Sequence, residues 1–272
     1  MPNQSSDDIN AIFGGTFDPP HNGHLLPLQQ AADILQLTHI SLMPAKVPAL
    51  KKGVSEGHHR IAMTRLLCEI DSRFSVNLSE FERDGISYTV DTLKHIKNKR
   101  PKQTIIFIIG LDSLRSLQKW HKWKTLFDYC HLVVMLRPAL NDSSTQSSGE
   151  FADKSIVRKL HPHEVASKLY DFHTSEAEFI KIVGSGIDEE LRSLLVSKLA
   201  QAESTHRGIN HAAFKDIIDK SAKGKLWFIK NSCLSVSSSN IRRQIENGET
   251  PNDLMPASIV NYIQTHQLYK TK

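Results

Sequence analysis

The fold is decided by Gly14-Gly15-Thr16-Phe17-Asp18-Pro19-Pro20-His21-Asn22-Gly23-His24-Leu25, which follows a short apolar run over residues 9–13. The apolar run predicts a strand that stops at the two glycines. Apolar residues at helical spacing over 24–35 predict a helix, with Pro27 tolerated near its start. Glycines allow close approach of the backbone to a ligand, and free N–H groups at a helix start bind anions. The stretch therefore predicts a strand–turn–helix unit that binds an anionic group.

The same alternation of strand and helix patterns continues along the chain. Further strands are predicted over 38–43, 74–78, 104–109, 131–136 and 226–229. The near-continuous apolar run at 104–109 is typical of a central parallel strand that is covered on both faces. Helices are predicted over 59–70, 89–97, 239–247 and 259–266, with Gly248 ending the third of these. Strands that alternate with helices predict an α/β fold with a doubly wound parallel sheet and C-terminal helices.

The periodicity also predicts which faces of two helices point inward. Helix 89–97 is expected to bury Val90, Leu93 and Ile96, and helix 59–70 to bury Ile61, Leu66, Leu67 and Ile70.

We expect a single domain over 9–272 and a flexible tail over 1–8. Composition shifts to Ser, Thr, Asp and Gln over 141–149, which is typical of a mobile loop. Residues 142–225 form a polar, partly helical insertion in this interpretation, with a helical stretch over 191–202. No motif that carries chemistry lies within it.

Composition narrows the class of protein. The chain has 272 residues, a net charge of +5 and 39% hydrophobic residues, with no apolar run long enough to span a bilayer. The polar, acidic start lacks the features of a secretory signal, and three widely separated cysteines fit a reducing cytosol. The positive charge suits an anionic ligand, while the scattered basic residues do not favour nucleic-acid binding. We expect a cytoplasmic protein with no membrane or nucleic-acid partner, which forms a possible homo-oligomer.

His21 and His24 are candidate catalytic residues because they converge at the start of the predicted helix. They can donate hydrogen bonds to phosphate oxygens and, when protonated, stabilise negative charge. A histidine pair at this spacing also fits a surface turn or a two-histidine metal site, and a metal-dependent hydrolase that uses His21, His24 and Asp112 stays an alternative. No Gly-x-x-x-x-Gly-Lys loop is present as a phosphate cradle.

Two further segments could bind a nucleotide. Ser237-Ser238-Ser239-Asn240-Ile241-Arg242 places hydroxyls at a helix start, with Arg242 one turn further on, although a serine cluster there is usually a helix cap. Gly110-Leu111-Asp112 follows the central strand, where ligands of α/β proteins bind. The simpler interpretation of Asp112 is again a cap.

The twelve-residue stretch resembles the signature of the nucleotidyltransferase superfamily with the His-x-Gly-His motif, in the form found in bacterial nicotinate-nucleotide adenylyltransferases. The resemblance implies a Rossmann-like nucleotidyltransferase fold that joins the AMP part of ATP to nicotinate mononucleotide, with Mg²⁺ bound with ATP. It implies that the motif histidines bind the ATP phosphates, that the serine segment with Arg242 grips the triphosphate, and that Gly110 and Asp112 bind adenosine. The implied ATP site comprises Gly14, Gly15, Thr16, Phe17, His21, His24, Gly110, Asp112, Ser237, Ser238, Ser239 and Arg242.

The acceptor site rests on segments that resemble the nicotinate-nucleotide branch. Tyr88-Thr89-Val90-Asp91-Thr92-Leu93, followed later by Trp120, implies that Thr89 and Trp120 line a pyridine pocket, while Trp123 is expected in the core. Arg137 matches an arginine near the substrate phosphate, and Lys51 a basic residue near the substrates. The branch usually has histidine where this chain has Leu50, and His58 and His59 lie nearby. Phosphopantetheine and nicotinamide mononucleotide remain alternative acceptors, and a nucleic-acid binder is the alternative outside enzymes.

Overall fold

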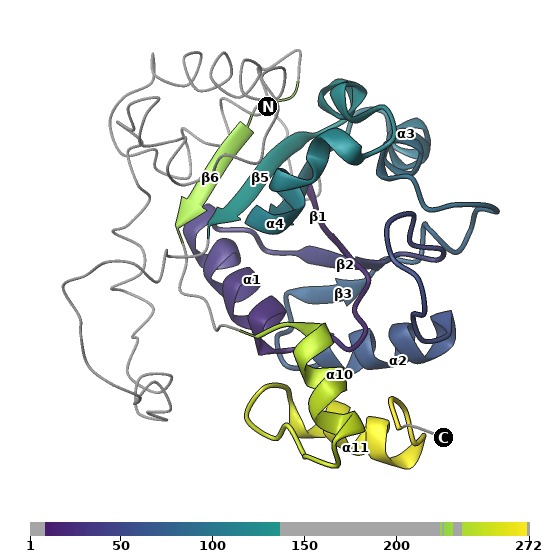
Figure 1. The fold of residues 1–272 in the computed structure, drawn as a ribbon. Coiled ribbons are helices and arrows are strands. Elements are labelled where there is room, and N and C mark those ends of the chain that lie inside the picture. Colours follow the sequence, from purple (N-terminus) through teal and green to yellow (C-terminus); the bar gives the residue numbers. More distant parts are fainter. Residues whose placement is uncertain (1–8, 137–223, 225, 231–235, 271–272) are drawn as a thin grey trace.

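The computed structural model describes residues 9–136, 224, 226–230 and 236–270, and these build one six-stranded sheet with helices on both faces (Figure 1). The strands are β1 (Ile9–Gly15), β2 (Ile40–Pro44), β3 (Phe74–Val76), β4 (Thr104–Gly110), β5 (His131–Leu136) and β6 (Leu226–Lys230). The helices are α1 (Asn22–Leu35), α2 (Gly57–Cys68), α3 (Thr89–Lys99), α4 (Leu111–Arg115), α10 (Ser238–Glu246) and α11 (Ala257–Thr265), with short 3₁₀ turns at Leu117–Lys119 and Trp123–Asp128.

The sheet confirms the predicted doubly wound topology. The strand order is β3-β2-β1-β4-β5-β6, and every pairing between these strands is parallel. The chain starts in the middle at β1, moves outward through β2 and β3, and then crosses back to β4. In open sheets of this kind, ligands bind beyond the carboxyl ends of the strands where the order reverses. That position lies between β1, which ends at Gly15, and β4, which ends at Gly110.

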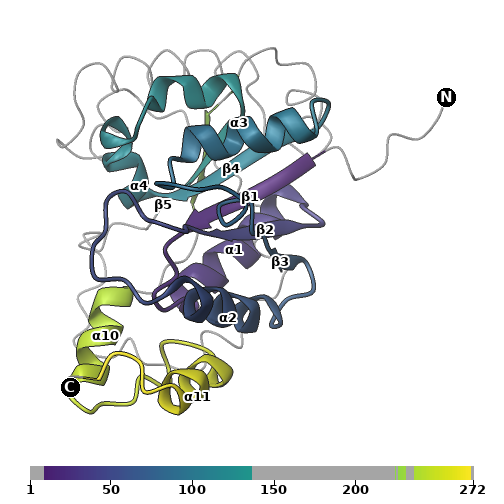
Figure 2. The same ribbon diagram turned by 90° about the vertical axis from the view of Figure 1, so that its right-hand side faces the viewer.

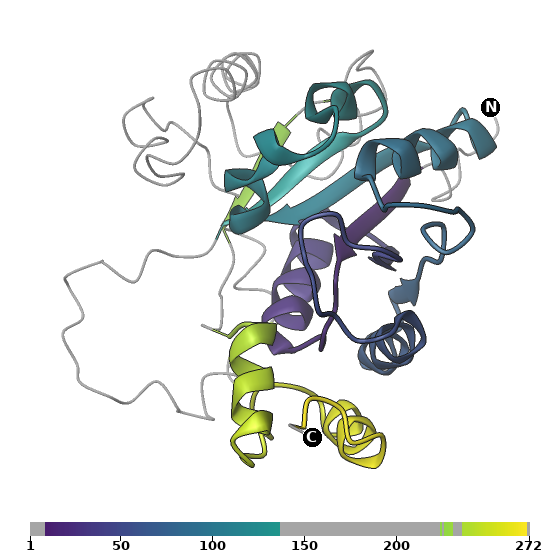
Figure 3. The same cartoon turned by 45° about the vertical axis from the view of Figure 1, so that its right-hand side comes forward.

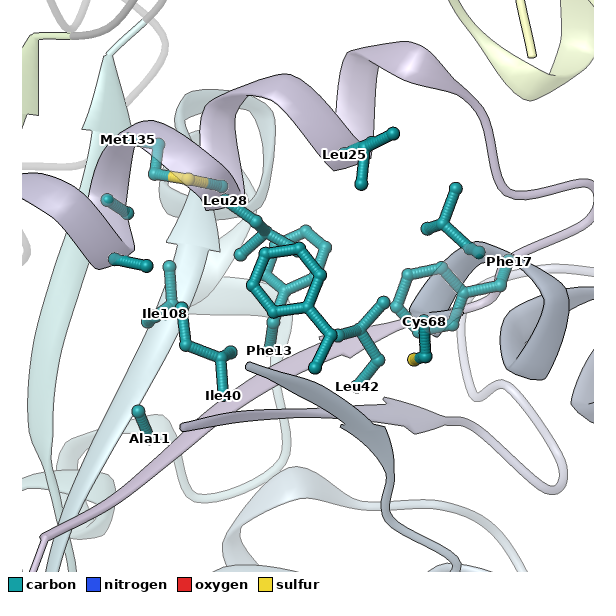
Figure 4. Close-up of a cluster of buried hydrophobic side chains, with 14 of the residues drawn as sticks. Ala11, Phe13, Phe17, Leu25, Leu28, Ile40, Leu42, Cys68, Ile108 and Met135 are labelled. Atoms are coloured by element: carbon teal, nitrogen blue, oxygen red, sulfur yellow. The ribbon is translucent and has the colours of Figure 1, made fainter. Parts of the chain in front are cut away.

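Alternate residues of the strands face two separate cores. Ala11 and Phe13 of β1 pack toward α1 and α2, whereas Ile12 packs toward α3 and the 3₁₀ turns. Figure 2 shows α1 and α2 below the sheet and α3 above it, and Figure 4 shows the first core around Phe13, Leu28 and Ile40. This period of two, in strands buried on both faces, explains why their sequences are almost continuously apolar.

The predicted inner face is confirmed for α3 and only in part for α2. Val90, Leu93 and Ile96 of α3 are buried. In α2, Leu67 is buried and Leu66 packs partly buried against the core, as predicted, but Ile61 is only partly buried and Ile70 lies beyond the helix and is half exposed. The buried residues of α2 are Arg60, Met63, Thr64, Leu67 and Cys68. Arg60 and Thr64 can face inward because backbone carbonyl groups around them accept hydrogen bonds from their side chains.

The two C-terminal helices lie together beside the start of α1 and close to α2 (Figures 1 and 3). Buried residues of both, including Ile241 and Ile259, belong to the same core as α1. Gly248 follows α10 with a φ of +81°, a left-handed conformation that suits glycine after a helix. The predicted tail over 1–8, the loop over 141–149, the insertion over 142–225 and its helix over 191–202 lie outside the described residues.

Candidate active site

The loop after β1 lies at the reversal point of the sheet and leads directly into α1. His21 is the N-cap of α1, and His24 is its third residue. The Nδ1 atom of His21 accepts a hydrogen bond from the Gly23 N–H at 3.1 Å, and Nδ1 of His24 accepts one from the His21 N–H at 3.2 Å. The two imidazoles thus form a capping box, which satisfies two N–H groups that the helix start would otherwise leave unpaired.

This cap determines which nitrogen of each imidazole carries the proton. Because each Nδ1 is an acceptor, the hydrogen bonds assign the proton of each neutral ring to Nε2. The ring centroids lie 3.9 Å apart, and the His24 ring also packs edge-on against Phe17 at 5.3 Å. The structure therefore holds two Nε2 donors side by side, with their orientation set by the backbone.

Two glycines of the motif are required by close packing. A Cβ on Gly23 would come within 2.7 Å of Val236, and one on Gly15 within 2.7 Å of the Phe17 ring. Real Cβ atoms do not approach that closely. Gly23 therefore lets the segment before α10 lie against the start of α1.

Segment 236–242 is fastened to the loop by hydrogen bonds from its side chains. Ser238 Oγ donates to the Pro19 carbonyl at 2.9 Å, and Arg242 Nη1 donates to the Asp18 carbonyl at 2.6 Å. Ser237 caps α10 by accepting from the Asn240 N–H at 3.2 Å. The serine segment is thus a helix cap, as its simpler interpretation predicted, and it also lies beside the two histidines.

Asp18 is a buried carboxylate that ties three segments together. Its Oδ2 accepts from the Ser55 N–H at 3.1 Å, and its Oδ1 accepts from the Tyr269 hydroxyl at 2.6 Å. Burial raises the pKa of Tyr269 strongly, and the neighbouring Asp18 charge raises it further, so the phenol stays a donor. Sequence reasoning did not identify Tyr269 as part of this site, because its partner lies 251 positions earlier.

Arg60 was also missed, although it is the largest fully buried side chain among the residues that the structure describes. Its guanidinium donates to the carbonyls of Thr16 (3.1 Å), Ala45 (2.6 Å), Lys46 (3.0 Å) and Ser55 (2.9 Å). These carbonyls belong to the loop after β1, the loop after β2 and the segment before α2. One side chain therefore fixes the relative positions of the loops that build the site.

A polar cavity of about 390 Å³ opens above the two histidines. The pKa of Lys51 in its wall is lowered, mainly by burial and then by the Arg242 charge, while Asp18 acts in the opposite direction. The lining gathers cations, hydroxyls and the two Nε2 donors, a set that suits a polyphosphate. We call it the phosphate cavity; it is lined by Thr16, Asp18, His21, His24, Lys51, Lys52, Val54, Asp112, Val236, Ser237, Ser238, Ser239 and Arg242.

A second cavity of about 520 Å³ adjoins the first and has a more apolar wall. Trp120 lies in its wall with its ring edge-on to Phe107, and Tyr88 stacks on His121 with centroids 4.4 Å apart. Thr16 and Lys51 line both cavities. We call it the acceptor cavity; it is lined by Gly14, Gly15, Thr16, Met43, Ala45, Pro48, Ala49, Leu50, Lys51, Glu80, Ile86, Ser87, Tyr88, Thr89, Phe107, Ser113, Ser116, Lys119, Trp120 and His121.

Most of the predicted site residues meet at these two cavities. Thr89, Trp120 and Lys51 line the acceptor cavity, as do Gly14 and Gly15, which the motif had associated with ATP. Trp123 is in the core, as predicted.

The remaining predicted residues lie elsewhere. Phe17 is buried beneath the motif with a φ of +53°, and Gly110 caps α4 without lining either cavity. Arg137 lies outside the described residues. His58 and His59 do not replace the absent histidine at Leu50, because neither lines the two cavities. His59 faces Tyr262 of α11 and His266 at its C-terminal end, and His58 stacks on His59 and pairs with Glu56.

A metal site made of His21, His24 and Asp112 is not supported by the geometry. In the part of the chain that the structure describes, no three His, Cys, Asp or Glu side chains are grouped so that they could hold a metal ion. The Nδ1 atoms of both histidines are also engaged by backbone N–H groups.

Comparison with known proteins agrees with this geometry. Residues 12–244 match the cytidylyltransferase-like family. The chain is 30% identical over 260 residues to a probable nicotinate-nucleotide adenylyltransferase of Pseudoalteromonas atlantica, covering 95% of this chain and 94% of the relative. It is 31% identical over 273 residues to one of Yersinia pestis, covering 99% and 100%.

A solved structure shows the same fold at lower sequence identity. The Plasmodium falciparum nicotinic acid mononucleotide adenylyltransferase complexed with NaAD superposes with a TM-score of 0.58 at 18% identity, over 96% of this chain and 97% of that one. The motif, the sheet and the sequence matches agree, and the chain belongs to the cytidylyltransferase-like family, among the nicotinate-nucleotide adenylyltransferases.

Proposed function

We propose that this protein transfers AMP from ATP to nicotinate mononucleotide, forming deamido-NAD and pyrophosphate. The observation that carries the proposal is the meeting of the two cavities at Thr16 and Lys51. One cavity suits a triphosphate, and the other offers an aromatic wall and the start of α3 to a pyridine nucleotide. The reacting phosphates of the two substrates would then lie where the cavities join.

The reaction needs no covalent intermediate. A phosphate oxygen of the mononucleotide attacks the α-phosphorus of ATP and forms a new P–O bond. The bond from that phosphorus to the oxygen bridging to the β-phosphate breaks, and pyrophosphate leaves with the electron pair. Because a phosphate monoester is already anionic at neutral pH, no general base is required, and catalysis consists of positioning and charge stabilisation.

The residues of the phosphate cavity supply that stabilisation. The Nε2 donors of His21 and His24 would bind triphosphate oxygens, and their fixed orientation means that little reorganisation is needed as charge develops. Arg242 and the Ser239 hydroxyl face the same cavity. Lys51 sits at the junction, where a cation offsets the charge of two approaching phosphates.

We also propose that Mg²⁺ arrives bound to ATP. Two carboxylates line this cavity. Asp18 is buried and both of its oxygens accept hydrogen bonds, whereas the side chain of Asp112 is exposed. Mg²⁺ prefers oxygen ligands and usually keeps several waters while it binds substrate phosphates. Asp112 would hold the hydrated ion, and the ion would neutralise charge on the leaving pyrophosphate. Loss of pyrophosphate release on chelation, with recovery on added Mg²⁺, is the expected result.

We also propose that this activity is cytoplasmic. Cys68 and Cys130 are buried free thiols, which suits a reducing compartment. As a separate finding, none of the helices among the described residues is long and apolar enough to cross a membrane.

The deciding experiment measures pyrophosphate release with ATP, Mg²⁺ and one acceptor at a time. Nicotinate mononucleotide should give the highest kcat/KM, followed by nicotinamide mononucleotide, and phosphopantetheine should give none. Release that is highest with the amide would move the assignment to the amide nucleotide. No release with any of the three acceptors would refute the proposed reaction.

A further inference from the structure

Glu80 is a buried carboxylate in the wall of the acceptor cavity and has no role in the reaction described above. Its exposure is 5%, and it is the only carboxylate among the described residues that line this cavity. A buried charge is costly unless hydrogen bonds or an opposite charge compensate it. Lys51 and Lys119 line the same cavity, but neither forms an ion pair with Glu80 in the described structure.

One oxygen of Glu80 is held by a directed chain of hydrogen bonds. Arg83 Nη1 donates to the Thr92 hydroxyl at 2.8 Å, and that hydroxyl donates to Glu80 Oε1 at 2.5 Å. The hydroxyl has a single proton, and Arg83 can only donate to it. Of the two acceptors within reach, Glu80 Oε1 at 2.5 Å is much closer than the Tyr88 carbonyl at 3.3 Å, so the proton points toward Glu80. Thr92 is fully buried in α3, so this chain fixes the orientation of the carboxylate.

The other oxygen, Oε2, has no hydrogen-bond partner among the described residues. This oxygen is not fully enclosed by protein, because the enclosed side-chain atoms without a partner among the described residues are Gln103 Oε1 and Gln118 Oε1. Buried polar atoms are nearly always paired, so an acceptor that is open to a cavity needs a donor from whatever fills that cavity. A carboxylate oxygen can only accept, which restricts the ligand group that it can meet.

We propose that Glu80 Oε2 accepts a hydrogen bond from a ribose hydroxyl of the acceptor mononucleotide. The inference rests on the proposed function and deepens it. At neutral pH, nicotinate mononucleotide has a carboxylate, a pyridinium ring without an N–H group and an ionised phosphate. Its only hydrogen-bond donors are the two ribose hydroxyls. Glu80 is then a residue that positions the acceptor sugar, and through it the attacking phosphate, at the junction of the cavities.

The test is a double-change cycle, in which one change is made in the protein and the other in the substrate. Wild type and Glu80→Gln are assayed for kcat/KM with nicotinate mononucleotide and with its 2′-deoxy and 3′-deoxy analogues. Wild type should lose about 10- to 100-fold with one of the analogues, the scale of a hydrogen bond to a charged group. Glu80→Gln should lose a similar factor with the parent substrate, and little more when that hydroxyl is removed as well.

Two controls separate recognition of the sugar from a structural role. Glu82→Gln changes an exposed glutamate that pairs with Lys99 and His95, and should leave all of these values unchanged. The KM for ATP should also stay unchanged in Glu80→Gln. If Glu80→Gln lowers kcat/KM by the same factor with the parent nucleotide and with both analogues, Glu80 only supports the fold, and the proposal is overturned.

If the Glu80→Gln variant does not fold, wild type alone still tests the proposal. Wild type alone must then discriminate against one deoxy analogue, and equal kcat/KM for the parent and both analogues refutes the proposal. Failure of the proposed function looks different, because wild type then gives no pyrophosphate with the parent nucleotide.

Discussion

The phosphate cavity and the acceptor cavity are built in different ways. The phosphate cavity joins the loop after β1 to the segment that starts α10, two stretches more than two hundred residues apart in the chain that are held by side-chain to backbone hydrogen bonds. The acceptor cavity is formed largely by residues between Gly14 and His121, with an aromatic wall and few charged groups. The first presents many donors, a set that suits a polyphosphate. The second presents few polar groups, whose positions decide the acceptor.

This difference predicts separate kinetic effects. Changes in the phosphate cavity should lower turnover with every acceptor, because they remove stabilisation of the reacting phosphates. Changes in the acceptor cavity should raise the KM of one substrate and leave ATP unaffected. Substitution of a residue that lines both cavities should lower turnover and also raise the KM.

The largest expected effect is that of His24→Ala. The substitution removes one fixed Nε2 donor and should reduce kcat by about 10²–10³-fold, the scale of losing one transition-state donor. The KM of nicotinate mononucleotide should change little. His39→Ala is the matched control, because this exposed histidine hydrogen-bonds to Ser75 far from both cavities. Near-normal turnover in the folded variant would remove His24 from the mechanism.

Arg60→Met should damage both cavities together. It leaves the carbonyls of Thr16, Ala45, Lys46 and Ser55 without their donor, and we expect a loss of about 3 kcal/mol in the free energy of unfolding. Urea denaturation measures that loss, and the KM values of both substrates should rise. Arg65→Met, at an exposed arginine one turn later on the same helix, should stay close to wild type. Wild-type stability in Arg60→Met would mean that the loops do not depend on the guanidinium.

Trp120→Ala tests the acceptor cavity by itself. Loss of the aromatic wall should raise the KM of nicotinate mononucleotide roughly 3- to 10-fold, the scale of an aromatic stacking contact, with the KM of ATP unchanged. Trp120→Phe should restore most of the affinity. A matching rise in the KM of ATP would show that the two cavities are not separate in function.

The smallest effect concerns pH and the contact of α2 with α11 and the residue that follows it. His59 packs against Tyr262 and His266, and its pKa is lowered, first by burial and then by His58 and His266, with Glu56 opposing the shift. A histidine whose pKa is depressed in the folded state destabilises that state when it is protonated. Stability from this contact is therefore present above a pH of about 6.5 and is lost as the pH falls below it.

The measurement compares melting temperatures of wild type and His59→Gln between about pH 7.5 and 5.5, the range in which a histidine titrates. The melting temperature of wild type should fall more on acidification than that of the variant, whose glutamine keeps a polar group near Tyr262 but cannot be protonated. Parallel losses in the two proteins would contradict a role for His59.

The sequence predicted the parts of the site that are local. His21 and His24 share one helix start, and the serine segment caps another, so spacing alone places their side chains. Arg60, Glu80 and Tyr269 could not be placed, because each is defined by partners on other elements. One usable signal existed for Arg60. It continues the stripe of Met63, Thr64 and Leu67, which has better helical spacing than the apolar residues predicted for the inner face.

The Tyr269 hydroxyl on Asp18 has a consequence for how the protein becomes active during its synthesis. At about 5–20 residues per second, a ribosome needs roughly 10–50 seconds to pass from the motif loop to this tyrosine, which lies 251 positions further on. Until then Asp18 lacks one of its partners, and the serine segment that meets Pro19 is also absent for most of that time. A nascent or prematurely ended chain therefore carries the histidine motif without its support. We therefore expect activity to be acquired only once nearly all of the described chain has been made.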